Sequence, residues 1–301
     1  MATIPEALNL ALQHHQSGRL PEAEALYRQI LQLQPGHADA LHLLGVVAHQ
    51  VGKHGMAVEY IARAIALNPT VAEYHNNLGE TCRALGKVNQ AAAHYQRALA
   101  LKPAYAEAYS NLGIILAWQG RLEEAASHCR QALALNSSFA EAHYNLGVAL
   151  QSLGKLADAV ESYRRAVALK PVYVDAQVNL AMALHGQGRR EDALKVLFDA
   201  LAVQPANAQL RGALASTLQG YVLHSAGDSV RATILSLCGD DNISMQNITT
   251  AVGGLAQNSP AFPRLVETMQ ADEDPYESAA PEAEAFMRDP LLLAALPRMV
   301  V

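Results

Sequence analysis

Apolar and small residues recur every 34 positions along the first two thirds of this 301-residue chain. Leucine, alanine and glycine each hold one position of the period in six successive copies, and proline holds another in five. A fixed period of this length indicates structural repeats that stack on their neighbours. The members are Leu10, Leu44, Leu78, Leu112, Leu146 and Leu180; Ala23, Ala57, Ala91, Ala125, Ala159 and Ala193; Gly18, Gly52, Gly86, Gly120, Gly154 and Gly188; and Pro35, Pro69, Pro103, Pro171 and Pro205, with Ser137 in the remaining slot.

Each period contains two helical segments. Between Ala106 and Trp118 apolar residues recur at helical spacing, and Gly120 follows as a stop because glycine tolerates the left-handed conformation. A second helix is predicted over 122–135, and prolines such as Pro103 end the second helix of each unit. The pattern therefore predicts an all-α chain built from antiparallel helix pairs.

Glycine also recurs in the middle of the first helix, at Gly45, Gly79, Gly113 and Gly147. There it costs about 1 kcal/mol relative to alanine. The repeated cost is understandable where another helix passes closely, and we expect the small Ala57 and Ala91 to face that crossing.

The segments Tyr109-Ser-Asn-Leu-Gly, Gly120-Arg-Leu-Glu-Glu-Ala and Tyr163-Arg-Arg-Ala-Val-Ala-Leu-Lys-Pro resemble the consensus of tetratricopeptide repeats. The resemblance covers residues 4–207. It implies a right-handed superhelical solenoid in which the first helix of each pair lines the concave side. The predicted organisation is six repeats at 4–37, 38–71, 72–105, 106–139, 140–173 and 174–207, a capping helix at 208–223, and a helical C-terminal region at 224–301.

Asparagine recurs at the sixth position of the first helix, where it would face the groove. Its amide can donate and accept, so a row of asparagines could pair with the backbone of an extended peptide. The row resembles the repeat region of O-linked N-acetylglucosamine transferases. Alternatively, the side chains bond between neighbouring helices and hold the stack. The row comprises Asn9, Asn77, Asn111, Asn145 and Asn179.

Other residues predicted on this face form a mixed polar and apolar surface. Chaperone-binding relatives grip a carboxylate with several cations, and only Arg83 fits that pattern here. Trp118 could anchor a partner side chain or fill the seam between two repeats. Acidic residues such as Glu73 and Glu107 begin most repeats, either to favour a basic or neutral peptide or to stabilise helix N-termini. The remaining predicted groove residues are His42, His49, Asn76, Glu80, Ser110, Ile114, Tyr144, Val148, Gln151, Met182 and His185.

Composition narrows the function classes. The chain is 51% hydrophobic and 5% aromatic with a formal charge of −6, which argues against nucleic acid as a ligand. Cys82, Cys129 and Cys238 lie far apart without a CxxC motif, so we expect buried, reduced thiols and no metal site. No signal peptide and no apolar run of about 20 residues is visible, so we expect a soluble, cytoplasmic protein without a membrane span.

Motifs of common catalytic and cofactor sites do not occur, so the sequence favours a non-enzymatic scaffold without cofactor that binds a protein or peptide partner. Two alternatives stay open: a recruiting or regulatory arm of a methyl- or glycosyltransferase whose active site follows residue 301, and a self-assembling scaffold that forms homo-oligomers. The first rests on Leu237-Cys-Gly-Asp-Asp-Asn-Ile and Asp289-Pro-Leu-Leu-Leu-Ala-Ala-Leu, which resemble a segment preceding methyltransferase-like regions in some bacterial proteins. The apolar ending at Val301 likewise predicts a piece of a longer protein.

Overall fold

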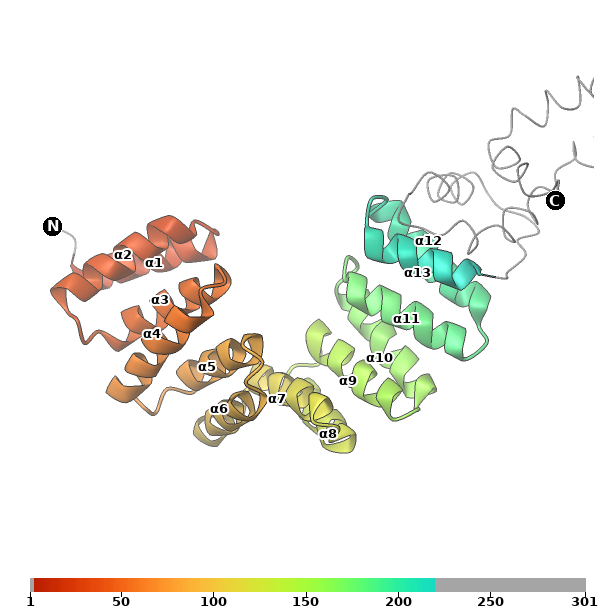
Figure 1. The fold of residues 1–301 in the computed structure, drawn as a ribbon, viewed down its shortest axis with the longest axis horizontal. Coiled ribbons are helices and arrows are strands. Elements are labelled where there is room, and N and C mark those ends of the chain that lie inside the picture. Colours follow the sequence, from red (N-terminus) through yellow and green to blue (C-terminus); the bar gives the residue numbers. More distant parts are fainter. Residues whose placement is uncertain (1–2, 220–301) are drawn as a thin grey trace, which may run out of the picture. The chain divides into compact units, whose positions relative to one another are not determined.

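The computed structural model describes residues 3–219, which form thirteen α-helices and no strand within that range (Figure 1). The chain divides into two units, residues 1–154 and 155–301. Unit 1 contains α1 (Ile4–Gln16), α2 (Leu20–Leu33), α3 (Ala38–Gln50), α4 (His54–Leu67), α5 (Ala72–Ala84), α6 (Val88–Leu101), α7 (Ala106–Trp118), α8 (Leu122–Leu135) and α9 (Ala140–Ser152). Unit 2 contains α10 (Leu156–Leu169), α11 (Val174–Gly186), α12 (Arg190–Val203) and α13 (Ala208–Leu218).

The period of glycines sets the turn inside each helix pair. Gly52 and its five equivalents all adopt φ between 70° and 77°, which is the left-handed conformation expected of helix-ending glycine. Two bonds then close the turn after α3: Gly52 N–H donates to the His49 carbonyl at 3.0 Å, and Lys53 N–H donates to the Ala48 carbonyl at 2.8 Å. This is the Schellman arrangement, which satisfies carbonyls that the helix end would otherwise leave without partners.

The alanine period lies where the two helices of a pair meet. Ala57, Ala91 and Ala125 are fully buried, and a Cβ built on Gly45 or Gly113 would lie 3.2 Å from the carbonyl oxygen of Ala57 or Ala125. The atoms nearest to such a Cβ belong to the side chains of Ile61 and Cys129, which follow Ala57 and Ala125 by four positions. A Cβ on Gly79 would lie 2.7 Å from the Tyr95 ring. The close approach of the two helices at these glycines is therefore confirmed. The side chains nearest to the glycines are those of Ile61, Tyr95 and Cys129, and not the alanines.

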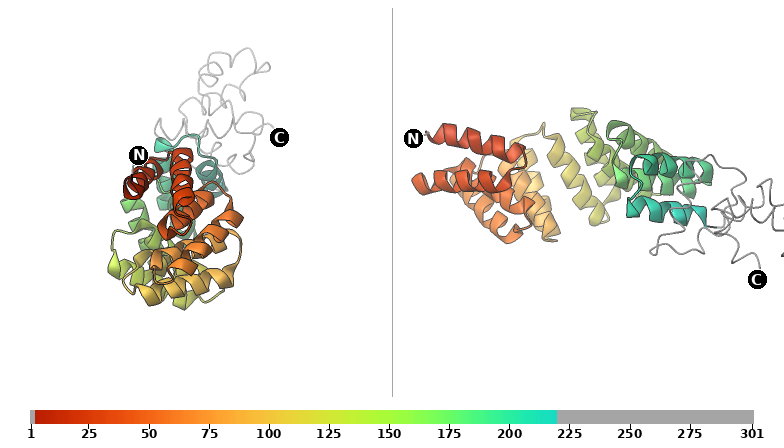
Figure 2. Two further views of the ribbon diagram at one scale, coloured as in Figure 1. Left: turned by 90° about the vertical axis from the view of Figure 1, so that its left-hand side faces the viewer. Right: turned by 90° about the horizontal axis from the view of Figure 1, so that it is seen from above.

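Helix pairs stack in sequence within each unit. In unit 1, α2 packs on α3, α4 on α5, α6 on α7 and α8 on α9, and Tyr27 and Ala23 of α2 form a buried cluster with Leu44 and Val47 of α3. The odd-numbered helices of unit 1 lie on the inner side of its bend, and the pairwise stacking is visible from two further directions (Figure 2). In unit 2, α11 packs against α10, α12 and α13. This is an all-α fold of the superhelical repeat class.

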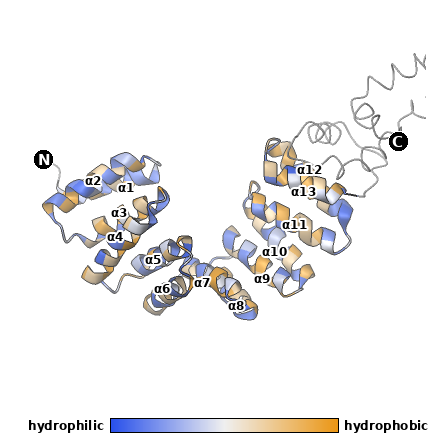
Figure 3. Ribbon diagram, viewed as in Figure 1, coloured by the Kyte–Doolittle hydropathy of each residue, from blue (hydrophilic) through white to orange (hydrophobic). Residues whose placement is uncertain are grey.

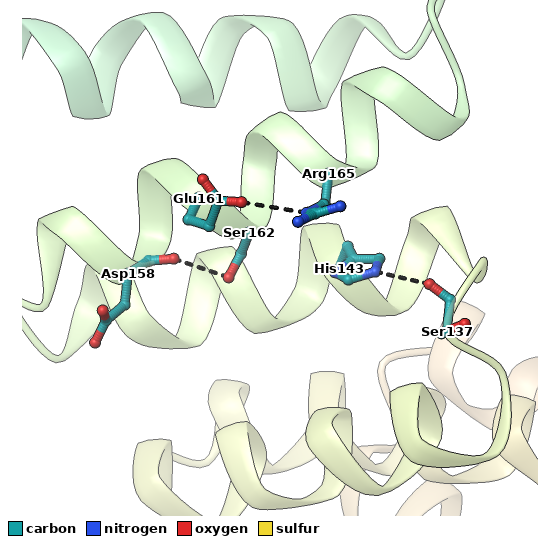
Figure 4. Close-up of polar contacts among 6 residues, drawn as sticks. All are labelled: Ser137, His143, Asp158, Glu161, Ser162 and Arg165. Carbon is teal, nitrogen blue, oxygen red and sulfur yellow. Dashed lines mark hydrogen bonds and ion pairs between the residues drawn. The ribbon is translucent and has the colours of Figure 1, made fainter.

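The fourth position of the first helix carries a polar residue in several repeats and ties the helix to the preceding turn. His143 Nε2 donates to the Ser137 carbonyl at 3.0 Å (Figure 4). His75 makes the same contact with Pro69 at 3.3 Å, and Gln177 with Pro171 at 2.7 Å. The side chain therefore anchors the loop in which the proline period lies.

Two predictions concern the region after the repeats. The predicted capping helix begins at Ala208 with Asn207 as its N-cap and is described as far as Leu218, while residues 220–223 lie outside the described residues. Residues 220–301, including Cys238 and the segments that resemble a methyltransferase-linked region, lie outside the described residues.

Candidate functional site

Polar side chains on α3, α5, α7 and α9 form a continuous row on the inner side of unit 1. Asn77 Nδ2 donates to His42 Nε2 on the preceding first helix at 2.8 Å. Asn111 Nδ2 donates to Asn76 Oδ1 and to Glu80 Oε1, both at 3.2 Å. Asn145 Nδ2 donates to Ser110 Oγ at 2.9 Å. We call these residues of α3 to α9 the polar row.

The polar row joins neighbouring repeats. Each bond of Asn77, Asn111 or Asn145 spans 31 to 35 positions of sequence, which is about one repeat. The amide donors therefore hold successive first helices together, as one of the two interpretations of the row predicted. A role of the same side chains in ligand binding stays a prediction. Asn9 is exposed on α1, and Asn179 is half-buried on α11 in unit 2.

Burial sets the charge states within the polar row. It lowers the pKa of His42 to about 4, although Asp39 and Glu73 act in the opposite direction. Because Asn77 donates to His42 Nε2, the neutral ring carries its proton on Nδ1. Burial also raises the pKa of Glu80, while the Asn111 N–H and the Arg83 charge lower it in part. The Nε atom of Arg83 is buried and has no hydrogen-bond partner among residues 3–219.

The acidic residues that begin the first helices also accept hydrogen bonds, either from the next first helix along the chain or, for Glu73, from within its own repeat. The Tyr74 hydroxyl donates to Asp39, and Lys102 donates to Glu73 Oε1 at 2.7 Å. In unit 2, Gln209 Nε2 donates to Asp175 Oδ1 at 3.0 Å. All three carboxylates also lie in the first turn of a helix, where the dipole favours negative charge.

The other predicted groove residues of unit 1 differ in accessibility. Trp118 ends α7 and is 57% exposed, so it does not fill a seam between repeats. His49 is half-buried and its ring lies 5.0 Å from that of His54, and its pKa is lowered by burial and by the charges of His54 and Arg83. Tyr144 and Gln151 are half-buried on α9. Trp118 is thus the large apolar side chain among these residues that remains accessible.

A mostly apolar pocket of about 470 Å³ lies between α11 and α13 in unit 2. Met182 on its wall is 55% exposed, and glycines on both helices leave room beside it. A Cβ on Gly212 would meet no heavy atom within 4 Å among the described residues, so none of these requires a glycine at this position. The lining consists of Val178, Met182, His185 and Gly186 of α11 and Ala208, Gln209, Gly212, Ala213, Ser216 and Thr217 of α13.

The sequence placed Met182 and His185 on the predicted groove face but did not predict a pocket beside them. Val178 and Gly212 occupy the same repeat position as Asn76 of the polar row, and Met182 occupies that of Glu80. One signal was available in the sequence: Gly212 does not occupy the repeat position of Gly45, Gly79 and Gly113, where a neighbouring helix passes closely. A glycine at another position of the helix can leave space beside it. This space becomes a pocket only because α11 and α13 lie side by side. The sequence did not reveal that contact, since the 34-residue pattern weakens after Pro205.

Nucleophilic and metal-binding side chains do not gather in the described part of the chain. Cys82 and Cys129 are buried free thiols, as expected, and burial raises the pKa of Cys129 to about 12. Residues 3–219 contain no group of three or more His, Cys, Asp or Glu placed to hold a metal ion. Within the same range, no helix has the length and apolar character needed to cross a membrane.

Comparison with family models identifies the repeats. Residues 3–70 and 105–171 match a model described as tetratricopeptide repeat, residues 144–209 match a second model of that description, and residues 79–120 match a TPR repeat model. No curated protein matches this chain.

Solved structures share the fold at low sequence identity. The crystal structure of the APC/C hetero-tetramer Cut9–Hcn1 aligns with a TM-score of 0.67 and 18% identity over 72% of this chain and 43% of that one. PilW, a type IV pilus biogenesis factor, aligns with a TM-score of 0.64 and 22% identity over 69% of this chain and 96% of that one. TTC0263, a TPR protein of Thermus thermophilus, aligns with a TM-score of 0.52 and 26% identity over 60% of this chain and 99% of that one.

Proposed function

We propose that this chain is a non-enzymatic module that binds an extended peptide segment of a partner protein. It belongs to the tetratricopeptide repeat family, because its repeats match tetratricopeptide repeat models and its helix pairs share that fold. The observation that carries the proposal is the pocket between α11 and α13. Its volume of about 470 Å³ lies in the range of small-ligand pockets, roughly 300–1,000 Å³. Such a volume accommodates a large apolar side chain.

Trp118 gives the proposal a second support in unit 1. A tryptophan that is 57% exposed at the end of an inner helix offers a large, rigid surface that loses little entropy when a ligand covers it. The polar row includes residues of the same helix, α7, and contains amide and carboxylate groups of the kind that pair with a peptide backbone. We therefore assign apolar anchoring to Trp118 and backbone pairing to the polar row in unit 1, and separately apolar anchoring to the α11–α13 pocket in unit 2.

The experiment starts from a phage-displayed library of random peptides selected on the whole 301-residue chain. Affinities of the selected peptides are then measured by fluorescence anisotropy for the wild type and for Gly212→Leu, which fills the pocket. The matched control is Gly55→Leu, because Gly55 lies in α4 and its Cβ also meets no described atom within 4 Å. We expect Gly212→Leu to weaken binding by about tenfold or more and Gly55→Leu to leave it unchanged.

A second pair of variants tests the anchor in unit 1. Trp118→Ala should weaken the binding of peptides that unit 1 holds, whereas Leu135→Ala should not, because Leu135 is an exposed aliphatic residue at the end of the outer helix α8. Selected peptides whose affinity neither Gly212→Leu nor Trp118→Ala changes would bind elsewhere, and the assignment would then be wrong.

A further inference from the structure

The first repeat leaves one face uncovered that the fold buries in every following repeat of unit 1. Leu10 of α1 is 46% exposed, whereas Leu44 at the same position of α3 is 3% exposed. The difference has a simple cause: α2 packs over Leu44, and its Ala23 and Tyr27 belong to the same buried cluster. The surface around Leu10 is thus an interface that this chain forms between its own repeats and that has no partner at α1 among the described residues.

This face combines a hollow with a projecting side chain. The hollow has a volume of about 550 Å³ and runs between α1 and α2, where Ile4, Ala7, Leu10 and Leu26 contribute its apolar wall. Leu33, at the end of α2, lines the rim of the same hollow and is 70% exposed. A hollow and an apolar knob on one face are the two halves of a self-complementary contact, which is what a two-fold interface requires.

Charge also favours a second copy at this face. The chain carries a net charge of −6, so most of its surface opposes association with an identical molecule. Among the residues that line the hollow, only Glu6 is charged, and its carboxylate already accepts the Thr3 backbone N–H at 2.8 Å in the cap of α1. The polar neighbours Gln29 and Gln32 are neutral.

We propose that two copies of this chain associate through the face formed by α1 and α2, with Leu33 of each copy inserted beside Leu10 of the other. The contact covers the face of α1 that a preceding repeat would cover, and it uses none of the residues assigned to peptide binding. Association through this face would pair two modules and thereby present two peptide sites in one assembly.

Sedimentation velocity of the whole chain over a wide concentration range tests the proposal. The wild type should convert from monomer to dimer as its concentration rises, and Leu33→Glu should weaken the dimer at least tenfold, because the two-fold axis would place two new carboxylates close together. Leu67→Glu is the matched control: Leu67 holds the same repeat position at the end of α4 and is 53% exposed, yet it lies in the second repeat. This control should dimerise like the wild type.

Hydrogen exchange at low and high protein concentration locates the contact independently. Protection that appears only on dimerisation should fall within residues 4–33. A wild type that stays monomeric at all concentrations, a dimer that Leu33→Glu does not affect, or equal weakening by both glutamate variants would overturn the proposal. Circular dichroism of each variant confirms that the fold is retained, as expected for substitutions at exposed positions.

Discussion

The helices α5 and α11 use the same repeat positions for opposite chemistry. In α5 these positions hold Asn76 and Glu80, which bond to Asn111 of the next first helix. In α11 they hold Val178 and Met182, which line an apolar pocket beside α13. Along the ribbon α5 is mostly hydrophilic, whereas α11 carries longer hydrophobic stretches (Figure 3).

This comparison separates the residues that build the repeat from those that give it a function. We call the periodic leucines, alanines and glycines, together with mid-helix glycines such as Gly79, the frame residues. They lie at helix crossings and turns, where a change of side-chain volume or of backbone conformation disturbs packing. The inner positions point away from these crossings, so their identity can change without loss of the fold. Half-buried polar residues there must satisfy one another's hydrogen bonds, and small or apolar residues leave space instead.

The strongest test of this separation is a change at a frame position of α5. Gly79→Ala places a methyl group 2.7 Å from the buried Tyr95 ring, and we expect a loss of roughly 2–3 kcal/mol of unfolding free energy. Urea denaturation followed by circular dichroism measures it. An unchanged unfolding free energy would show that α5 and α6 can separate without penalty, and Gly79 would no longer count as a frame residue.

The charge state of the polar row offers the next test. His42 is neutral in the folded chain with a pKa of about 4, below the value of about 6.5 in the unfolded chain. The unfolded chain therefore takes up the proton first, so the stabilisation is complete above pH 6.5 and is lost as the pH falls toward 4. From about pH 7 to about pH 5 this contribution should fall by roughly 2 kcal/mol.

The control for this pH dependence is His42→Gln, since glutamine can accept the N–H of Asn77 but does not titrate. Urea denaturation at both pH values should show a smaller loss for the variant by that amount. Identical losses in the two proteins would mean that His42 does not set the acid sensitivity of unit 1.

Removing one amide of the polar row should have a smaller effect. Asn111→Ala deletes the donors to Asn76 and Glu80, and we expect a loss of about 1–2 kcal/mol because Glu80 is left partly buried with fewer partners. The pKa of Glu80 should rise further, which NMR titration of the carboxyl carbon can follow. If stability and the Glu80 pKa both stay constant while peptide affinity falls, the row serves the ligand more than the stack.

The smallest expected effect is at the pocket. Gly212→Ala should increase stability by about 0.5–1 kcal/mol, because alanine favours the helix and its Cβ meets no described atom within 4 Å. Thermal unfolding of this variant beside Gly79→Ala gives opposite signs for the same chemical change. A loss of stability at Gly212 would show that α13 packs more tightly than its glycine indicates.

Local rules were sufficient for the helix pairs. Six glycines predicted as helix stops all adopt positive φ, and the helices α1, α3, α5, α7, α9 and α11 begin at the residues where the period placed the repeats. Each of these features depends on neighbours within one repeat, which is why sequence spacing reveals it. The helix predicted at Ala208 begins at that residue in the structure, and its predicted end at 223 stays a prediction.

Contacts between repeats required the structure. Asparagine at the sixth position allowed both bonding across the stack and pairing with a peptide, and only the position of Ser110 or His42 beside it identified an acceptor within the chain. Trp118 could have been buried in a seam, and the arrangement of α7 leaves it exposed.

The amino-acid sequence alone thus determined the repeat, its two helices and its turns. Contacts within one repeat join residues that are close in the sequence, so the spacing of small and apolar residues predicts them. Which inner side chains meet, and where a hollow is left between them, was decided by tertiary structure. The reason is physical: these contacts join residues about one repeat apart, and their geometry depends on how successive helix pairs are rotated against each other.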